Sequence, residues 1–140
     1  MKHPYWTEIV DIQRRVALAW QTYAQGNKED GLKQMAAAAD AEDATDKSAV
    51  TPGPLAPARE LLGDMLLGAG RPADALRAYE GTIAKEPNRF RAEFGAGKAA
   101  SLAGDRDRAA MHYKRLIEIC KSSDTERPEL KEARASVGNR

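Results

Sequence analysis

Histidine and cysteine, the side chains best suited to nucleophilic or metal chemistry, are scarce in this sequence. The chain has two histidines, His3 and His112, and one cysteine, Cys120. The histidines lie far apart, whereas a helical metal site would pair two of them at i and i+4. No histidine adjoins Cys120, and no serine stands in a G-x-S-x-G setting. We expect His112 at the surface and Cys120 at least half-buried in a helix, with no catalytic residue, metal site or cofactor.

The acidic and proline-rich segments in the middle of the chain also resemble binding motifs, but each has a simpler interpretation. The acidic cluster consists of Asp40, Glu42, Asp43 and Asp46. It lacks the spacing and the central glycine of a calcium-binding loop. Negative charge at the C-terminal end of a helix is unfavourable, so we expect a frayed, solvated helix end there. Pro54 and Pro57 match the minimal polyproline ligand motif, but the chain must become helical directly afterwards, so a turn is expected.

The composition indicates an all-α protein. Of the 140 residues, 26 are alanine, whereas there are four valines, five isoleucines and six threonines. Alanine is the best helix former because it loses no side-chain entropy, and small residues let helices approach closely. The formal net charge is +1, from 22 basic and 21 acidic residues. With this balance and no basic run, a nucleic-acid partner is not expected.

The sequence contains no stretch that predicts membrane insertion or export. No run approaches the ~18 consecutive apolar residues of a membrane span, and the first residues lack the apolar core of a signal peptide. A single cysteine leaves no partner for an internal disulfide. We therefore expect a cytoplasmic protein without a membrane partner, or a periplasmic or exported one if the sequence is a piece of a longer precursor.

A repeat organises the second half of the chain. Gly63, Gly70, Ala75 and Tyr79 recur 34 positions later as Gly97, Gly104, Ala109 and Tyr113. The first glycine of each unit lies mid-helix, where glycine costs roughly 1 kcal/mol relative to alanine, so another helix is expected to pack against bare backbone. The tyrosines are expected to fill the space between successive hairpins. A weaker, earlier unit is related by an offset of 44, because the segment 26–32 mirrors the segment 70–76.

The period and these positions resemble the tetratricopeptide repeat (TPR), with its pattern W-x2-L-G-x2-Y…A-x3-F…P. The clearest unit, at about 56–89, keeps the Leu-Gly pair and the Ala-x3-aromatic spacing, but has Arg59 in place of the family tryptophan. The resemblance covers roughly residues 5–123 and suggests the C-terminal repeats of a bacterial TPR protein. It implies one domain over 1–140, a right-handed α-solenoid of three hairpins at about 5–44, 55–87 and 88–121 with a capping helix at about 128–137.

Capping and breaking residues set the expected helix boundaries. We expect helices at about 5–25, 28–43, 55–69, 72–85, 88–103, 106–121 and 128–137. Asn88 and Asp105 are expected to be the N-caps of the fifth and sixth helices. The segment 45–57 contains three prolines, so no helix can cross it, and we expect an ordered, stiff loop there.

The resemblance also implies where a partner binds. In TPR proteins the first helix of each hairpin lines a concave face, and partners usually bind there. In this sequence that face would carry Trp20, Tyr23, Glu60, Asp64, Arg91, Phe94 and Lys98. These residues predict a peptide partner with an apolar anchor, basic charge near the two acidic residues and acidic charge near the two basic ones. The alternative is that Trp20 and Phe94 only pack between hairpins.

The sequence therefore predicts a protein–protein interaction scaffold without catalytic activity. A second interpretation is a structural module, the C-terminal portion of a longer bacterial TPR protein. A third is a domain that self-associates through its first helix, which carries Trp6, Ile9 and Val10. Some TPR proteins hold the C-terminal carboxylate of a peptide with a Lys/Asn/Arg clamp. The acidic Glu60 and Asp64, with no asparagine beside them, argue against that mode.

Overall fold

The computed structural model describes residues 5–45, 54–124 and 126–138, and this part of the chain consists of helices joined by turns. The described helices are α1 (Tyr5–Ala24), α2 (Lys28–Asp43), α3 (Ala58–Gly68), α4 (Pro72–Lys85), α5 (Phe90–Leu102), α6 (Arg106–Ile119) and α7 (Pro128–Gly138). These bounds agree with the expected ones to within three residues. The all-α class predicted from the alanine content is confirmed.

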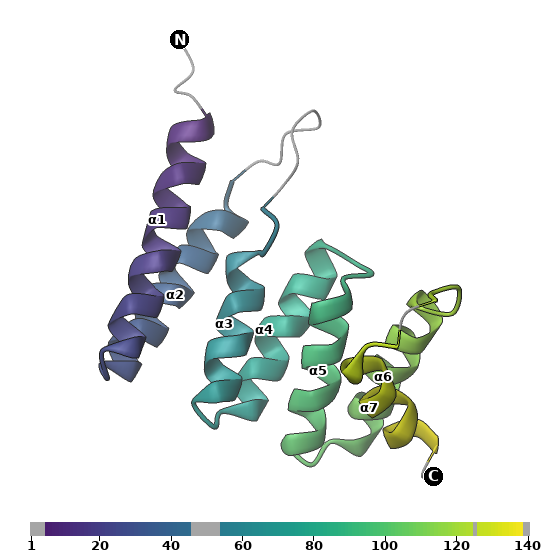
Figure 1. Cartoon of the computed structure of the whole chain (residues 1–140). Helices are drawn as coiled ribbons and strands as arrows, with labels where there is room; N and C mark the ends of the chain where they lie inside the picture. The colour runs from purple at the N-terminus through teal and green to yellow at the C-terminus, as the bar shows by residue number, and fades with distance from the viewer. Residues whose placement is uncertain (1–4, 46–53, 125, 139–140) are drawn as a thin grey trace.

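The helices form three antiparallel hairpins stacked side by side (Figure 1). In each hairpin the first helix, α1, α3 or α5, lies in one layer and the second, α2, α4 or α6, lies in the other. Each hairpin contacts the next through α2 against α3 and α4 against α5. The last helix, α7, packs across α6 and the edge of α5. This arrangement is the expected α-solenoid with a capping helix.

A glycine in the left-handed conformation ends the first helix of every hairpin. Gly26, Gly70 and Gly104 have φ values of +96°, +73° and +82°. In each case the next amide donates a hydrogen bond to the carbonyl five residues earlier, as from Arg71 to Leu66. This Schellman geometry strains residues that carry a Cβ, which explains the glycine. The first hairpin therefore has the same kind of turn as the two later ones.

The repeat tyrosines pack against bare glycine backbone. A Cβ built on Gly63 would lie 2.7 Å from the ring of Tyr79, and one built on Gly95 would lie 2.5 Å from the same ring. Tyr79 is 1% exposed and so fills the space between α3, α4 and α5. Tyr113 lies equally close to Gly97. The expected pairing of small and large residues at the helix crossings is confirmed.

The acidic end of α2 is held by basic residues of the second hairpin. Arg59 on α3 donates hydrogen bonds to Asp43 and to Asp40, the latter at 2.6 Å. The Lys85 ammonium lies 3.1 Å from the Asp43 carboxylate and donates to its backbone carbonyl at 2.6 Å. The prediction of a frayed, solvated helix end is therefore wrong, because these cations neutralise the end of α2. Glu42 also contacts the second hairpin, since it accepts a hydrogen bond from the amide of Ala58 at 2.8 Å. The fourth acidic residue, Asp46, lies outside the described residues, as does segment 46–53 of the expected stiff loop.

Two helix starts test the capping predictions. Asp105 caps α6, because its side chain accepts a hydrogen bond from the amide of Arg108 at 3.1 Å. Asn88 is not the cap of α5, since that position belongs to Arg89. Asn88 instead adopts a left-handed φ of +66°, and its amide oxygen accepts a hydrogen bond from Arg115 at 2.6 Å. Asparagine tolerates this conformation better than most residues, which explains its place in the turn.

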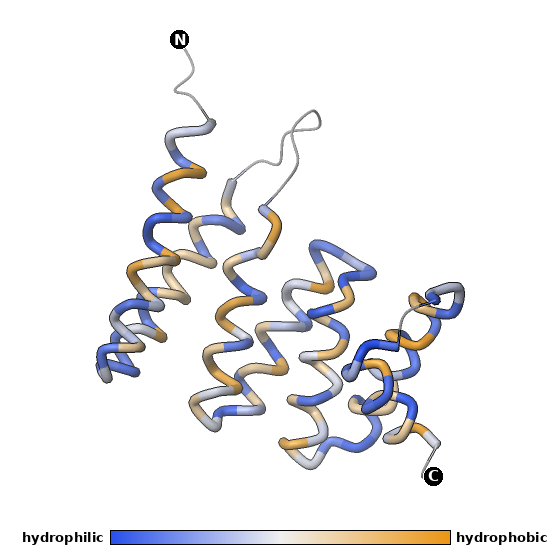
Figure 2. Tube along the Cα trace, in the orientation of Figure 1, coloured by the Kyte–Doolittle hydropathy of each residue, from blue (hydrophilic) through white to orange (hydrophobic). Residues whose placement is uncertain are grey.

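Apolar and hydrophilic residues alternate along each helix (Figure 2). None of the described helices is both long and apolar enough to cross a lipid bilayer. The capping helix follows this pattern, since Leu130 and Ala133 are 1% and 0% exposed and pack with Tyr113 and Leu116. Its remaining residues are mostly exposed, as a terminal cap requires.

Candidate binding groove

A hollow of about 270 Å³ lies between α3, α5 and the segment that leads into α7. Its apolar lining comes from Leu67 on α3 and from Phe90 and Phe94 on α5. Four residues predicted from the sequence lie together at this hollow, namely Asp64, Arg91, Phe94 and Lys98. The prediction missed five other lining residues, namely Tyr79, Phe90, Gly95, Arg127 and Glu129. Positions 127 and 129 belong to the capping segment, whose placement beside α5 is not encoded in the repeat spacing.

The charges of Asp64 and Arg91 neutralise each other across the hollow. The Arg91 guanidinium donates to one oxygen of Asp64 at 2.6 Å, and the Tyr79 hydroxyl donates to the other at 2.6 Å. Burial and the neighbouring Asp64 raise the pKa of Tyr79 well above its ordinary value, so the phenol remains a donor. Because both carboxylate oxygens already have a donor, a basic residue of a ligand gains little by approaching Asp64.

Glu60 lies beneath this surface rather than on it. Its side chain is 0% exposed, and its oxygens accept hydrogen bonds from Arg89 at 2.8 and 3.3 Å. Arg91 adds a longer ion-pair contact of 3.6 Å. The prediction that Glu60 faces a ligand is corrected here, because the turn before α5 supplies a cation that buries the carboxylate. Glu60 joins the second and third hairpins.

Two exposed cationic side chains, Lys98 and Arg127, cover the aromatic rings of the hollow. The Lys98 ammonium lies 5.5 Å from the centroid of the Phe94 ring, and the Arg127 guanidinium lies 4.5 Å from that of Phe90. Lys98 also approaches Glu132 of α7 at 3.6 Å. Such contacts at exposed sites stabilise by only ~0.5–1 kcal/mol. An apolar ligand side chain would therefore reach the rings by displacing these two exposed side chains.

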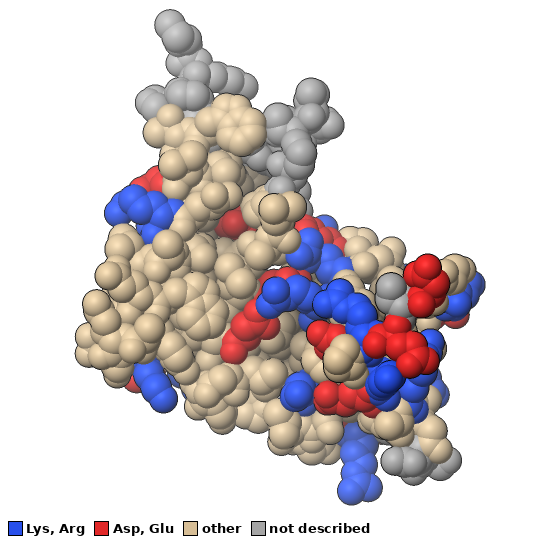
Figure 3. All heavy atoms as spheres, in the orientation of Figure 1, with Lys and Arg blue, Asp and Glu red and all other residues tan. Residues whose placement is uncertain are grey.

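Trp20 and Tyr23 lie on α1, apart from this hollow. Their rings meet edge to face with centroids 6.0 Å apart, and both side chains are half-buried against the main core. The Lys28 ammonium lies 5.8 Å from the centroid of the Tyr23 ring. Most of the visible face over α1 and α3 is uncharged, whereas charged residues gather over α5 and α7 (Figure 3). The face formed by α1, α3 and α5 thus has an uncharged region and a charged region.

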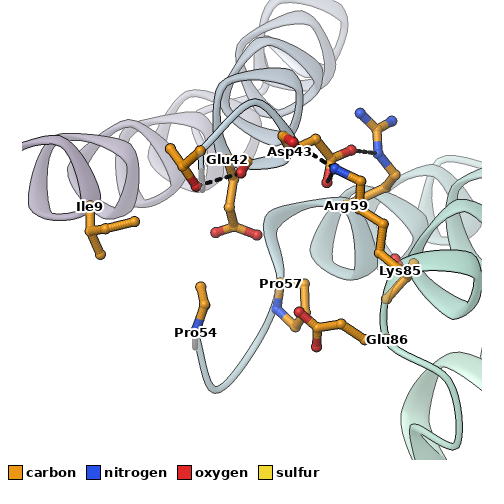
Figure 4. Close-up of a pocket in the computed structure, with 10 residues that line it drawn as sticks. Ile9, Glu42, Asp43, Pro54, Pro57, Arg59, Lys85 and Glu86 are labelled. Carbon is orange, nitrogen blue, oxygen red and sulfur yellow. Dashed lines mark hydrogen bonds and ion pairs between the residues drawn. The ribbon is translucent and has the colours of Figure 1, made fainter. Parts of the chain in front are cut away.

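Two further cavities lie at the contacts of α2 with the second hairpin, and both are lined by charged as well as apolar residues. One of about 220 Å³ lies where α2 meets the second hairpin, beside Ile9 and Pro57, and its charged lining includes the Arg59–Asp43 pair (Figure 4). Another of about 510 Å³ lies between α2 and α4, over Leu62 and Leu66. In the described part of the chain, no group of histidine, cysteine and acidic side chains is arranged to hold a metal ion.

The position of His112 differs from the prediction. Its side chain, expected at the surface, is buried with 5% exposure, and its Nδ1 atom lies 2.8 Å from Glu93. No local pattern around His112 predicts this burial, because the acidic partner comes from another helix. Cys120 is half-buried, as predicted, but it is the C-cap residue directly after α6 and not part of the helix.

Comparison with solved structures identifies the fold. No protein-family model matches the sequence, and no curated protein matches it either. PcrH from Pseudomonas aeruginosa superposes with a TM-score of 0.68 at 19% identity, over 92% of this chain and 90% of PcrH. The two chains share a fold. PcrH in complex with the chaperone-binding region of PopD gives a TM-score of 0.70 at 19% identity, over 92% of this chain and 90% of that one. The complex with the corresponding region of PopB gives 0.66 at 18% identity, over 96% and 98%.

Proposed function

We propose that this chain is a protein-interaction module that binds a peptide segment of a partner protein along α1, α3 and α5, without catalysing a reaction. The observation that carries the proposal is the hollow between α3 and α5, where Leu67, Phe90 and Phe94 offer an apolar floor. The similar fold of PcrH, solved with the chaperone-binding regions of PopD and PopB, supports the same use of this fold.

The chemistry of the face specifies the peptide. Its apolar residues should lie over the uncharged region of α1 and α3, beside Trp20 and Tyr23, with one anchor in the hollow against Phe94. Acidic residues should follow the anchor, because Lys98 and Arg127 lie over the aromatic rings. The peptide needs no basic residue opposite Asp64, since the charge of Asp64 is neutralised by Arg91. The apolar anchor should supply most of the affinity, and the charges should orient the peptide.

Selection from a random dodecapeptide library displayed on phage tests this proposal. We expect the enriched peptides to share an apolar residue followed by acidic residues. A Phe94→Ala variant should then bind the selected peptides at least about tenfold more weakly, as truncation of a buried aromatic anchor does. Affinities would be measured by fluorescence anisotropy, after circular dichroism has shown that the variant is folded.

Leu102→Ala is the matched control. Leu102 also lies on α5 but is 62% exposed and outside the hollow, so its truncation should change affinity less than about twofold. Failure to enrich any peptide would contradict the proposed function. Equal affinities of the Phe94 and Leu102 variants would contradict the placement of the groove.

A second candidate function is self-association through α1. Trp6 and Val10 lie one helical turn apart and are 55% and 63% exposed, while the neighbouring Ile9 is buried and is not available. We expect sedimentation velocity to show a species that grows with concentration. Val10→Glu should weaken this association at least about tenfold because it places a charge in the contact, whereas Gln21→Glu, at an exposed polar position of α1, should not. A parent chain that stays monomeric at every concentration would contradict the idea.

A further inference from the structure

Charged residues occupy the same position of the repeat in the second and third hairpins, and both are ion-paired. Arg59 and Glu93 are separated by the repeat length of 34 and occupy the place where the TPR pattern has tryptophan. Arg59 reaches across its joint to Asp40 and Asp43. Glu93 is 3% exposed and meets His112 instead. The contact of α6 with α4 and α5 thus includes a histidine, the residue whose ordinary charge change falls between about pH 5 and 8.

His112 lies between two carboxylates from two different helices. Its Nδ1 atom is 2.8 Å from Glu93 of α5, and its Nε2 atom is 3.4 Å from Glu80 of α4. Glu80 also accepts from Arg108, one turn before His112 on α6, at 3.3 Å. The charged residue of α7 that contacts α6, Glu132, hydrogen-bonds Tyr113 rather than His112.

A neutral imidazole can donate from only one of its nitrogens, so it cannot serve both carboxylates. The protonated ring donates from both. Because His112 and Glu93 are both buried, water cannot replace the donor to Glu93 without opening the joint, whereas Glu80, whose side chain is 31% exposed, keeps Arg108 as a donor. The geometry therefore favours the imidazolium form in the closed joint.

We propose that His112, Glu93 and Glu80 form a proton-dependent latch that holds α6 against α4 and α5. This inference is independent of peptide binding and concerns the joint between the second and third hairpins. At low proton concentration the ring loses one of its two donors, and the attachment of the third hairpin weakens. Among the residues that the structure describes, the ion pairs of Arg59 with Asp40 and Asp43 involve no histidine, so this contact should not respond in the same way.

The direction of the pH effect follows from the balance at His112. Burial, the largest single influence, lowers the pKa of this histidine, but the hydrogen bonds to Glu93 and Glu80 and their negative charges together outweigh it, so the pKa is raised. A raised folded-state pKa stabilises the protein fully below the unfolded value of about 6.5. That stabilisation is lost as the pH rises through the folded pKa. The latch should therefore be closed in mild acid and released in mild alkali.

An NMR titration of the imidazole signals tests the latch in the folded chain. The sequence has two histidines, so a His3→Gln variant leaves His112 as the only one. We expect its imidazole to titrate above the ordinary value of about 6.5. A midpoint at or below that value would overturn the proposal.

Thermal melting provides the second test. From about pH 6 to about pH 9, the melting temperature of the parent should fall by roughly 3–5 °C more than that of His112→Gln, which cannot titrate. Lys114→Gln removes one positive charge from an exposed position of the same helix and should retain the parental fall. A His112→Gln variant that melts with the parental pH dependence would overturn the latch. If the His112→Gln variant does not fold, the NMR titration of His112 in the His3→Gln variant decides whether the latch exists.

Discussion

A Gly63→Leu variant is expected to lose about 3 kcal/mol of unfolding free energy, the upper range for overpacking a well-filled core. The position has no space for a side chain, because even a Cβ there would lie 2.7 Å from the ring of Tyr79. That ring cannot move aside, since it is also held against Gly95 and hydrogen-bonded to Asp64. Urea denaturation followed by circular dichroism measures the effect.

Gly68→Leu is the matched control in the same helix. A Cβ on Gly68 would meet only the hydroxyl of Tyr23, at 4.0 Å, and the residue is exposed. This substitution should change stability by less than about 0.5 kcal/mol, as is usual for surface positions. If both variants unfold at the same urea concentration, Tyr79 does not pack against α3 as described.

Arg89→Met is expected to destabilise the domain by about 3 kcal/mol. The change removes the main partner of Glu60, a carboxylate with 0% exposure, and breaking one side of a buried ion pair leaves a charge without water or a counter-ion. The contact from Arg91 at 3.6 Å remains, which places the loss at the lower end of the ~3–5 kcal/mol range for such pairs. Chemical denaturation again gives the free energy.

Two further variants distinguish the effect of leaving Glu60 buried without its partner from the effect of losing any arginine. Arg71→Met breaks ion pairs on the surface, where the arginine is 45% exposed, and should cost less than about 1 kcal/mol. Replacing Glu60 and Arg89 together by methionine should recover much of the loss, because no unpaired charge is left inside. An Arg89→Met protein as stable as the Arg71→Met protein would show that Glu60 does not depend on this partner.

The sequence by itself determined the architecture. The turns within the hairpins need a residue with a positive φ, which is glycine at positions 26, 70 and 104. Such a turn depends only on residues close to it in the sequence, so the sequence predicts it. Helix type and length follow from alanine-rich periodicity, again over short distances. Even part of the groove could be predicted, because Arg91, Phe94 and Lys98 lie at helical spacing on one face of α5 and therefore stay together whatever surrounds them.

Only the tertiary structure decided which polar residues are buried. Glu60 and His112 resemble the exposed charges of any soluble helix, and the sequence assigned both to the surface. Their partners lie 29 residues away at Arg89, and 19 and 32 residues away at Glu93 and Glu80. A charged side chain can be buried only where another element supplies its counter-charge, and this depends on how the hairpins dock. Arg127 and Glu129 line the hollow for the same reason, since their place beside α5 follows from the packing of α7.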